Sequence, residues 1–224
     1  MNYQLLSYPL DIADPGFPGE PTLSIQKSTR IADGDMYNSS IVHLFNHFGT
    51  HFDAPNHFNP KGATISELPL QRFIYERPLL LDIPKSAGEM IQPIDLEIHL
   101  SAIRRADFLM IRTGLEKLRM QHPNQYATKG VAVSVQTARY LMEHAANLKA
   151  LGFDFISLAS PDHPEQGIKS HQIMLGMFSH HFICIIEDMK LSAVDKTRLK
   201  RIFAMPLLIR GIDSAQVCIL AESE

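Results

Sequence analysis

Side chains that commonly bind transition metals are concentrated in the segment HFGTHFDAPNH, residues 47–57. His47, His51 and Asp53 all occupy odd positions, so in an extended chain they project from one face. A straight strand would separate the Cα atoms of His47 and His51 by roughly 13 Å, near the limit for sharing an ion. A bend at Gly49 would shorten that distance, because glycine tolerates backbone angles that other residues resist.

A helical conformation of the same segment is disfavoured. On a helix, Asp53 would point about 120° away from His47 around the axis. A single ion could then not easily contact both histidines and the aspartate. Gly49 and Pro55 also disfavour a helix. We therefore expect an extended segment with a bend.

Two imidazoles and one carboxylate suit Zn²⁺, Mn²⁺ or Fe²⁺, and three protein ligands leave positions open for water. Such an ion lowers the pKa of bound water and polarises a substrate carbonyl. His57 follows the Pro55 turn, and the ordinary pKa of histidine suits proton transfer near neutral pH. The alternative is a histidine-rich loop with incidental hydrogen bonds. The combination of Asp53 and His57 with the histidine pair favours the metal site.

Short apolar runs flanked by turn residues predict the strands that position this segment. They cover residues 39–45, 79–83, 108–112, 153–158, 182–187 and 217–220. The clearest helix runs from about Ser134 to Lys149, with Ser134 as its N-cap and an apolar stripe along one face. Weaker helices are expected at 95–105, 170–177 and 192–203. Because strands and helices interleave, the fold class is α/β or α+β with a mixed sheet.

The overall composition limits the possible classes of protein. A length of 224 residues predicts a single domain over 1–224. The formal net charge of −3 provides no basic excess for phosphates, so no nucleic-acid partner is expected. The chain has only two cysteines, Cys184 and Cys218, and both lie in apolar runs. This excludes a disulfide framework and fits a reducing compartment. The N-terminal residues lack the pattern of a signal peptide, and no apolar run reaches membrane-spanning length, so we expect a cytoplasmic protein without a membrane partner.

The segment HFGTHFDAPNHF resembles the H-x-G-T-H-x-D-x-P-x-H signature of the metal-dependent cyclase family, which includes bacterial arylformamidases (kynurenine formamidases) and isatin hydrolase. The similarity extends over nearly the whole chain, with further matches at residues 6–10, 18–21, 111–114, 152–157 and 206–213. The resemblance implies a mixed β-sheet partly rolled into a barrel with helices packed outside. It also implies a homo-oligomer, either a dimer or a tetramer.

The resemblance further implies metal ligands in the second half of the chain. His171 and Glu187 match positions at which the family places a metal histidine and a metal glutamate. Glu187 also ends an apolar strand, where an unpaired carboxylate would be costly to bury. By resemblance, one ion is bound by His47, His51 and Asp53, and a second by Asp53, His171 and Glu187. One or two divalent transition-metal ions, Zn or Mn, are therefore expected.

Some segments depart from the family pattern. The gap between His171 and Glu187 is long, and residues 178–181 look like an inserted turn. His180 and His181 are possible substitute ligands there, although an exposed loop is favoured. Ala159 and the segment 213–216 replace family residues, and neither change is expected to touch the metal ligands. Because the chain has no tryptophan, phenylalanines are the candidates for apolar pocket walls, although each could instead be a core residue. These are Phe17, Phe48, Phe52 and Phe58.

The leading hypothesis is an arylformamidase-like, metal-dependent amidohydrolase that cleaves the C–N bond of a small molecule. Either an N-formyl aryl amide or a cyclic amide would be attacked by a metal-activated water, and His57 would pass a proton to the leaving nitrogen. One alternative is a cyclase- or dehydratase-type lyase on a small cyclic intermediate. Another is a non-catalytic binding protein on the same fold. Structural zinc sites normally have four protein ligands, so an Asp53 shared by two open sites favours catalysis.

Overall fold

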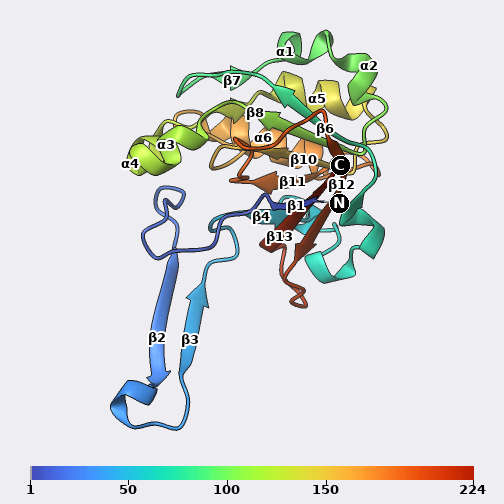
Figure 1. The fold of residues 1–224 in the computed structure, drawn as a ribbon. Helices are drawn as coiled ribbons and strands as arrows, with labels where there is room; N and C mark the ends of the chain where they lie inside the picture. The colour runs from blue at the N-terminus through green and yellow to red at the C-terminus, as the bar shows by residue number, and fades with distance from the viewer. Residues whose placement is uncertain (1) are drawn as a thin grey trace.

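A sheet of nine strands dominates the computed structural model, which describes residues 2–224 (Figure 1). Its two end strands are nearly adjacent in sequence, because β5 ends at Tyr75 and β6 begins at Pro78. The amides of Glu76 and Arg77 between them both donate to the carboxylate of Asp107. The sheet therefore curls into a nearly closed barrel. Its strand order is β5 (Ile74–Tyr75), β12 (Leu199–Pro206), β13 (Ser214–Ser223), β4 (His51–Asp53), β11 (Cys184–Glu187), β10 (Ala150–Phe153), β8 (Phe108–Arg112) and β6 (Pro78–Asp82), with β1 (Asn2–Leu5) paired to β13.

The half of the sheet formed by β6, β8, β10 and β11 is parallel and is covered by helices. Parallel neighbours need crossover connections, and helices supply several of them. The two longest helices, α5 (Val135–His144) and α6 (Pro164–Met174), lie over this half (Figure 1). The short elements around them are β7 (Met90–Ile91), α1 (Pro93–Glu97), α2 (Leu100–Ile103), α3 (Glu116–Gln121), α4 (Pro123–Thr128) and β9 (Ala132–Val133).

Strand β8 shows how the sheet separates two hydrophobic cores. Leu109 and Ile111 pack in the core that contains the helices, whereas Phe108 and Met110 pack in the core inside the barrel. Both faces of this strand are thus buried, which explains its continuous apolar sequence. The predicted fold class, a mixed α/β sheet partly rolled into a barrel with helices outside, is confirmed.

A two-stranded hairpin projects away from the barrel. It consists of β2 (Leu23–Thr29) and β3 (Ser39–Leu44), which pair with each other and with no other strand of the described chain (Figure 1). We call residues 23–44 the arm. Its base continues directly into the histidine segment, because Phe45 follows β3 and begins the turn that leads to His47.

Most of the predicted elements are present with shifted bounds. Ser134 caps α5, since its Oγ accepts a hydrogen bond from the amide of Thr137 at 3.1 Å. The helix expected at 95–105 is divided into α1 and α2, and α6 begins at Pro164, before the expected residue 170. The strand expected at 153–158 is found earlier in the chain, as β10, which ends at Phe153. The helix expected at 192–203 is wrong, because strand β12 begins at Leu199.

None of the helices in the described part of the chain combines the length and the apolar character needed to cross a bilayer.

Candidate metal centre

Strand β4 lies between β11 and β13, and this position assembles the centre of the site. His51 is directly opposite Glu187 across the β4–β11 pair. Residues opposite one another in an antiparallel pair have neighbouring side chains. His51 Nε2 accordingly lies 3.4 Å from Glu187 Oε2 and 3.5 Å from Asp53 Oδ1. The three side chains are almost completely buried.

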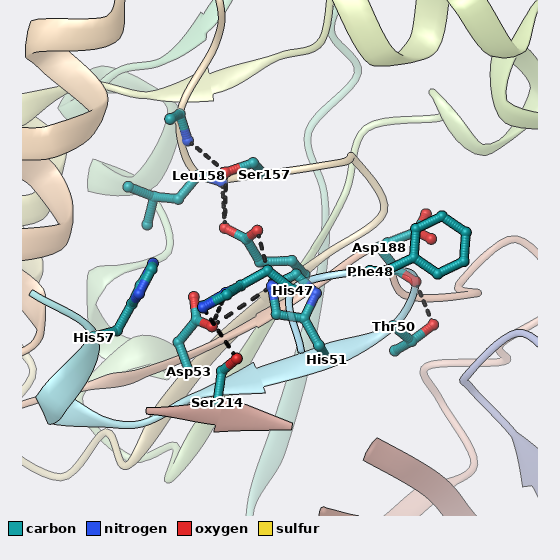
Figure 2. A network of polar contacts seen from close by, with 12 residues as sticks. His47, Phe48, Thr50, His51, Asp53, His57, Ser157, Leu158, Asp188 and Ser214 are labelled. Atoms are coloured by element: carbon teal, nitrogen blue, oxygen red, sulfur yellow. Dashed lines mark hydrogen bonds and ion pairs between the residues drawn. The ribbon is translucent and has the colours of Figure 1, made fainter. Parts of the chain in front are cut away.

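The expected bend at Gly49 is present and brings His47 to the same place. Gly49 has a φ of +67°, a left-handed conformation that favours glycine. Past this bend, His47 Nδ1 lies 3.1 Å from Asp53 Oδ1. Figure 2 shows His47, His51 and Asp53 converging, with His57 beside them. The extended, bent geometry expected from the spacing is therefore correct.

The histidine rings are oriented as metal ligands usually are. His51 Nδ1 lies 2.8 Å from the carbonyl of Gly49, and His171 Nδ1 lies 2.8 Å from the carbonyl of Gly167. A carbonyl can only accept, so each Nδ1 carries the proton and each Nε2 keeps a free lone pair. A ring nitrogen held in this way by a backbone carbonyl is typical of metal-binding histidines.

Buried polar atoms without partners support the same interpretation. His51 Nε2 and both carboxylate oxygens of Asp53 are buried and make no hydrogen bond. An unpaired buried polar group is costly, and a charged one is more so. A divalent ion coordinated by these atoms would remove that cost. The donor set of imidazoles and carboxylates suits a transition metal, so the residues present fit the ion.

The charges around the site also attract a cation. Burial of the His47 ring lowers its pKa, but the carboxylates of Asp53 and Asp213 outweigh this and raise the pKa to about 10. Burial raises the pKa of Glu187, yet the neighbouring rings of His171 and His51 hold that pKa well below its usual value. The site thus stabilises positive charge close to three carboxylates.

Asp213 is a site residue that the sequence analysis missed. Its Oδ2 lies 2.9 Å from His47 Nε2 and 2.8 Å from His57 Nδ1, so one carboxylate oxygen holds both rings. Asp213 reaches them because it immediately precedes β13, in which Ser214 pairs with Asp53. The expectation that segment 213–216 does not touch the ligands is therefore wrong. The match of residues 206–213, which end at Asp213, to the family pattern was the available signal, but a sequence separation of 156 residues from His57 hid the contact.

The rest of segment 213–216 braces the turn that carries His47. Ser214 Oγ lies 3.1 Å from His47 Nε2 and donates to the carbonyl of Asn46. Gln216 Nε2 donates to the carbonyls of Phe45 and Phe48 on either side of His47. This replacement of the family residues thus has a structural role at the site.

His171 and Glu187, the two ligands expected from the second half of the chain, lie close together. His171 Nε2 is 3.6 Å from Glu187 Oε1. The same oxygen accepts hydrogen bonds from Ser157 Oγ at 3.1 Å and from the amide of Leu158 at 2.6 Å. Figure 2 shows Ser157 and Leu158 beside the centre. These contacts hold the Glu187 carboxylate in one orientation.

Two sets of ligand atoms are close enough to share an ion. One contains His51, Asp53 and Glu187, and the other contains His47, Asp53 and His57. Asp53 belongs to both, as the resemblance implies, but the other members are divided differently from the expected partition. The number of ions and the ligands of each remain predictions.

The loop between α6 and β11 keeps its two histidines outside these sets. His180 is exposed and His181 is partly exposed. Neither belongs to a metal-binding group among the described residues. The interpretation of residues 178–181 as a turn is consistent with this position.

A cavity of about 320 Å³ opens onto the centre. Its polar side contains His47, His57, His171 and Glu187, and its lining also includes Ala159. Aromatic and aliphatic side chains form most of the remaining wall, namely Phe17, Phe45, Phe58, Ile156, Pro164 and Ile168, and Glu20, Ser157 and Ser160 complete it. Of the four phenylalanines considered as walls, Phe17 and Phe58 line the cavity. Phe48 and Phe52 are core residues with 1 % and 0 % exposure.

Comparison with known proteins identifies the family. The Cyclase family model, described as "Putative cyclase", matches residues 5–160. The chain belongs to this family. The matched region includes the whole histidine segment, so the resemblance inferred from the sequence is confirmed.

Relatives of this Cyclase-family protein include proteins with and without an assigned activity. An "Uncharacterized protein" of Haemophilus influenzae is 34 % identical over 129 residues, which cover 58 % of this chain and 91 % of the relative. A kynurenine formamidase of Paracidovorax citrulli is 41 % identical over 69 residues, 31 % of this chain and 32 % of the relative.

Solved structures share the fold. Isatin hydrolase A from Labrenzia aggregata has a TM-score of 0.80 at 18 % identity, covering 98 % of this chain and 93 % of that one. A "predicted metal-dependent hydrolase" from Bacillus stearothermophilus has a TM-score of 0.75 at 23 % identity, with coverage of 98 % and 97 %. The Cyclase-family protein thus has a metal-dependent hydrolase-like fold and a candidate site for a divalent metal.

Proposed function

We propose that this protein is an arylformamidase-like, metal-dependent amidohydrolase that cleaves the C–N bond of an N-formyl aryl amide or a cyclic amide. The buried, unpaired atoms of His51 and Asp53 beside the mostly apolar-walled cavity are the observation that carries this proposal. The formamidase and isatin hydrolase among the similar proteins support the substrate class.

His47, His51, Asp53, His171 and Glu187 would hold one or two ions, with Zn²⁺ or Mn²⁺ expected from the ligand types. When bound, such an ion supplies a Lewis acid that lowers the pKa of water and polarises a carbonyl oxygen. The backbone carbonyls of Gly49 and Gly167 keep the rings of His51 and His171 in the ligand tautomer.

His57 is the proposed proton carrier. Its Nδ1 is held by the Asp213 carboxylate at 2.8 Å, which leaves Nε2 to exchange a proton. Because His57 lines the cavity, Nε2 can take a proton from an attacking water and deliver it to the leaving nitrogen. Asp213 stabilises the imidazolium between these two events.

The cavity walls determine which amides fit. Phe45 and Phe58 stand on the same cavity as His57, and the Phe58 ring stacks on His171 with 4.6 Å between centroids. A flat aryl group can pack against such faces while its carbonyl points to the polar side. This arrangement favours an aryl or fused-ring amide over a linear aliphatic one.

Turnover on a small panel of amides tests the proposal. The protein is depleted with a chelator and reloaded separately with Zn²⁺ and Mn²⁺. It is then assayed on an N-formyl aniline derivative, a fused cyclic amide and a linear aliphatic amide. We expect hydrolysis of an aryl substrate that is lost on depletion and restored by one of the metals. Absence of hydrolysis by the fully loaded protein on every aryl amide would contradict it.

We also propose that copies of the chain associate through the arm. Ile25 pairs with Val42 and Leu23 with Leu44, so these side chains share one face of the hairpin. Ile25 and Val42 are 51 % and 55 % exposed. An isolated two-stranded hairpin is marginally stable in water. A partner that covers this apolar face would stabilise the arm.

The groove beside the arm fits a second copy. It has a volume of about 550 Å³ and is lined by Val42 and Leu44 together with Leu207 and Ile209 of the β12–β13 connection. A stable interface takes roughly 20–30 residues from each partner. Residues 23–44 and the adjoining connection supply a comparable number of residues, and they contain no basic cluster that would favour nucleic acid.

Molar mass in solution tests this association. We expect a dimer or tetramer by light scattering, and dissociation in Ile25→Lys. Ile98→Lys is the matched control, because Ile98 is 83 % exposed on the distant α1 segment. A monomeric wild-type protein at micromolar concentration would contradict the proposal.

We further propose a cytoplasmic location, since the unpaired Cys184 and Cys218 suit a reducing compartment.

A further inference from the structure

A closed ring of contacts lies directly behind the candidate metal centre. Thr50 Oγ1 donates to the carbonyl of Asp188 at 2.6 Å and accepts from the amide of Tyr8 at 3.1 Å. The Asp188 carboxylate accepts from Nε and Nη2 of Arg119, each at 2.9 Å. The Arg119 guanidinium in turn lies 3.8 Å from the centre of the Tyr8 ring. We call these four residues the Arg119 ring.

The Arg119 ring touches both strands that carry proposed ligands. Thr50 immediately precedes His51 at the start of β4, and Asp188 immediately follows Glu187 at the end of β11. A shift of either ring member therefore moves a ligand that is one peptide unit away. Figure 2 shows the Thr50–Asp188 contact beside His51.

Asp188 has an unusual backbone that its contacts must hold. Its φ is +53°, the sole positive value at a non-glycine position in the described residues 2–224. This region is rarely adopted by residues with a side chain and persists only when the surroundings fix it. The contacts that fix it are the backbone bonds from the amides of Asp188 and Met189 to the carbonyls of Phe155 and Phe153, and three side-chain contacts. These three are the fork of Arg119, the hydroxyl of Tyr126 at 2.6 Å and the hydroxyl of Thr50. The chain direction after Glu187 thus depends on them.

Arg119 also reaches the loop that contributes Phe17 to the cavity wall. Its Nη1 donates to Asp14 Oδ1 at 3.0 Å, while Nε and Nη2 remain on Asp188. Asp14 stands in the same loop as Phe17, which lines the cavity. One buried guanidinium therefore connects a cavity wall to the end of a ligand strand. A lysine could not make both contacts, because it lacks the planar fork.

We propose that Arg119 is a positioning residue that fixes Glu187 and His51 through Asp188, and fixes the Phe17 loop through Asp14. The proposal rests on the metal-dependent function proposed above. It assigns two separable effects to one side chain. The Asp188 contacts set metal binding, and the Asp14 contact sets substrate binding.

Arg119→Lys and Asp14→Asn test the two effects, with Arg112→Lys as the matched control. Arg112 also pairs with a carboxylate, at Asp82, and with backbone carbonyls, but it does not contact the ligand strands β4 or β11. For each purified protein, Co²⁺ affinity is measured by chelator competition, and the visible absorption of bound Co²⁺ is recorded. KM and kcat are then measured on an amide that the wild type hydrolyses. Circular dichroism checks that each variant is folded.

Arg119→Lys is expected to weaken Co²⁺ binding about 10–100-fold and to change the absorption spectrum, as loss of an outer contact to metal ligands does. Asp14→Asn is expected to keep the Co²⁺ affinity and spectrum and to raise KM about fivefold, the effect of replacing a charge-assisted hydrogen bond with a neutral one. Arg112→Lys should match the wild type in metal affinity and KM within about twofold.

Wild-type Co²⁺ affinity and spectrum in folded Arg119→Lys would overturn the positioning role, even if its melting temperature fell. An unchanged KM in Asp14→Asn would overturn the connection to the cavity wall. Both outcomes leave the proposed function intact, provided that the wild type binds metal and hydrolyses its amide. A wild type that binds no Co²⁺ and hydrolyses no amide would instead overturn both proposals.

Discussion

In the metal centre, His51, Asp53 and Glu187 are 2 %, 0 % and 4 % exposed, whereas in the arm Ile25 and Val42 are 51 % and 55 % exposed. Each region places side chains in a solvent environment that is unfavourable for them: charged groups are buried in the centre, and apolar groups are exposed in the arm. Buried carboxylates lose hydration, and exposed aliphatic side chains order water. The structure supplies hydrogen bonds for most polar atoms of the centre but leaves His51 Nε2 and both carboxylate oxygens of Asp53 without one. It supplies no cover for the apolar face of the arm.

The difference shows what each region lacks. Unpaired polar atoms in a rigid, buried place call for a small charged ligand, which a divalent ion satisfies. An apolar ribbon face on a protruding hairpin calls for a large apolar surface, which another polypeptide provides. Substitutions matched between the two regions should therefore separate effects on metal and turnover from effects on association.

The largest contrast is expected from two histidines. His57→Ala should lower kcat by about 10²–10⁴-fold while the metal content stays unchanged, because it removes the proton carrier but not a proposed ligand. His43→Ala, at an exposed position of the arm, should leave kcat unchanged. Steady-state kinetics and metal analysis check both. Loss of metal from His57→Ala would instead assign His57 to the ligand set with His47 and Asp53.

Two glycines with positive φ give the next contrast. Gly49→Ala should destabilise the protein by about 1–2 kcal/mol, the cost of a left-handed residue with a side chain. It should also weaken metal binding, because the added Cβ would come within 2.3 Å of Leu10 Cδ2 and push the turn that sets His47.

Gly34→Ala carries similar strain at a φ of +96° in the arm, with nothing within 4 Å of the added Cβ. Its metal affinity should equal that of the wild type. Denaturant unfolding and chelator competition measure the two quantities. Equal metal affinities for the two variants would contradict the positioning role of the Gly49 bend.

The smallest effect is expected at a surface ion pair outside both regions. Hydrogen bonds from Arg112 and Lys196 lower the pKa of Asp82. The stabilisation is therefore fully present above the unfolded pKa of about 3.9 and is lost as the pH falls through the lower folded value. Asp82→Asn should cost less than about 1 kcal/mol at pH 7, because the pair is partly exposed.

The same variant should show a smaller loss of stability than the wild type between pH 5 and acidic conditions. Urea unfolding at several pH values measures it. A steeper acid dependence in Asp82→Asn than in the wild type would contradict this interpretation.

Local patterns predicted much of this molecule. The even spacing of His47, His51 and Asp53, with a glycine between the two histidines, was sufficient to predict an extended, bent segment. Ser134 marked the start of α5 because capping is determined within one helical turn. The apolar run of β8 was recognisable since a strand buried on both faces has no polar positions.

Other features depend on contacts between distant segments. Asp213 meets His57 only because β13 pairs with β4, a register that no local pattern encodes. The segment 192–203 has helix-compatible spacing, but pairing with β13 makes its end, from Leu199, a strand. The Arg119 ring consists of residues 8, 50, 119 and 188, which are far apart in the sequence and share no regular spacing. In segment 192–203, strand pairing outweighed the local helix propensity. The other two features are contacts between residues that are distant in the sequence.

Metal analysis of the purified protein and of Asp53→Ala tests the central claim most directly. Asp53 is completely buried and is shared by both groups of candidate ligands. We expect one or two equivalents of a divalent transition metal in the wild type, and loss of metal from every site in folded Asp53→Ala. A wild-type protein that binds neither Zn²⁺ nor Mn²⁺ after incubation, or an Asp53→Ala variant with unchanged metal content, would contradict it.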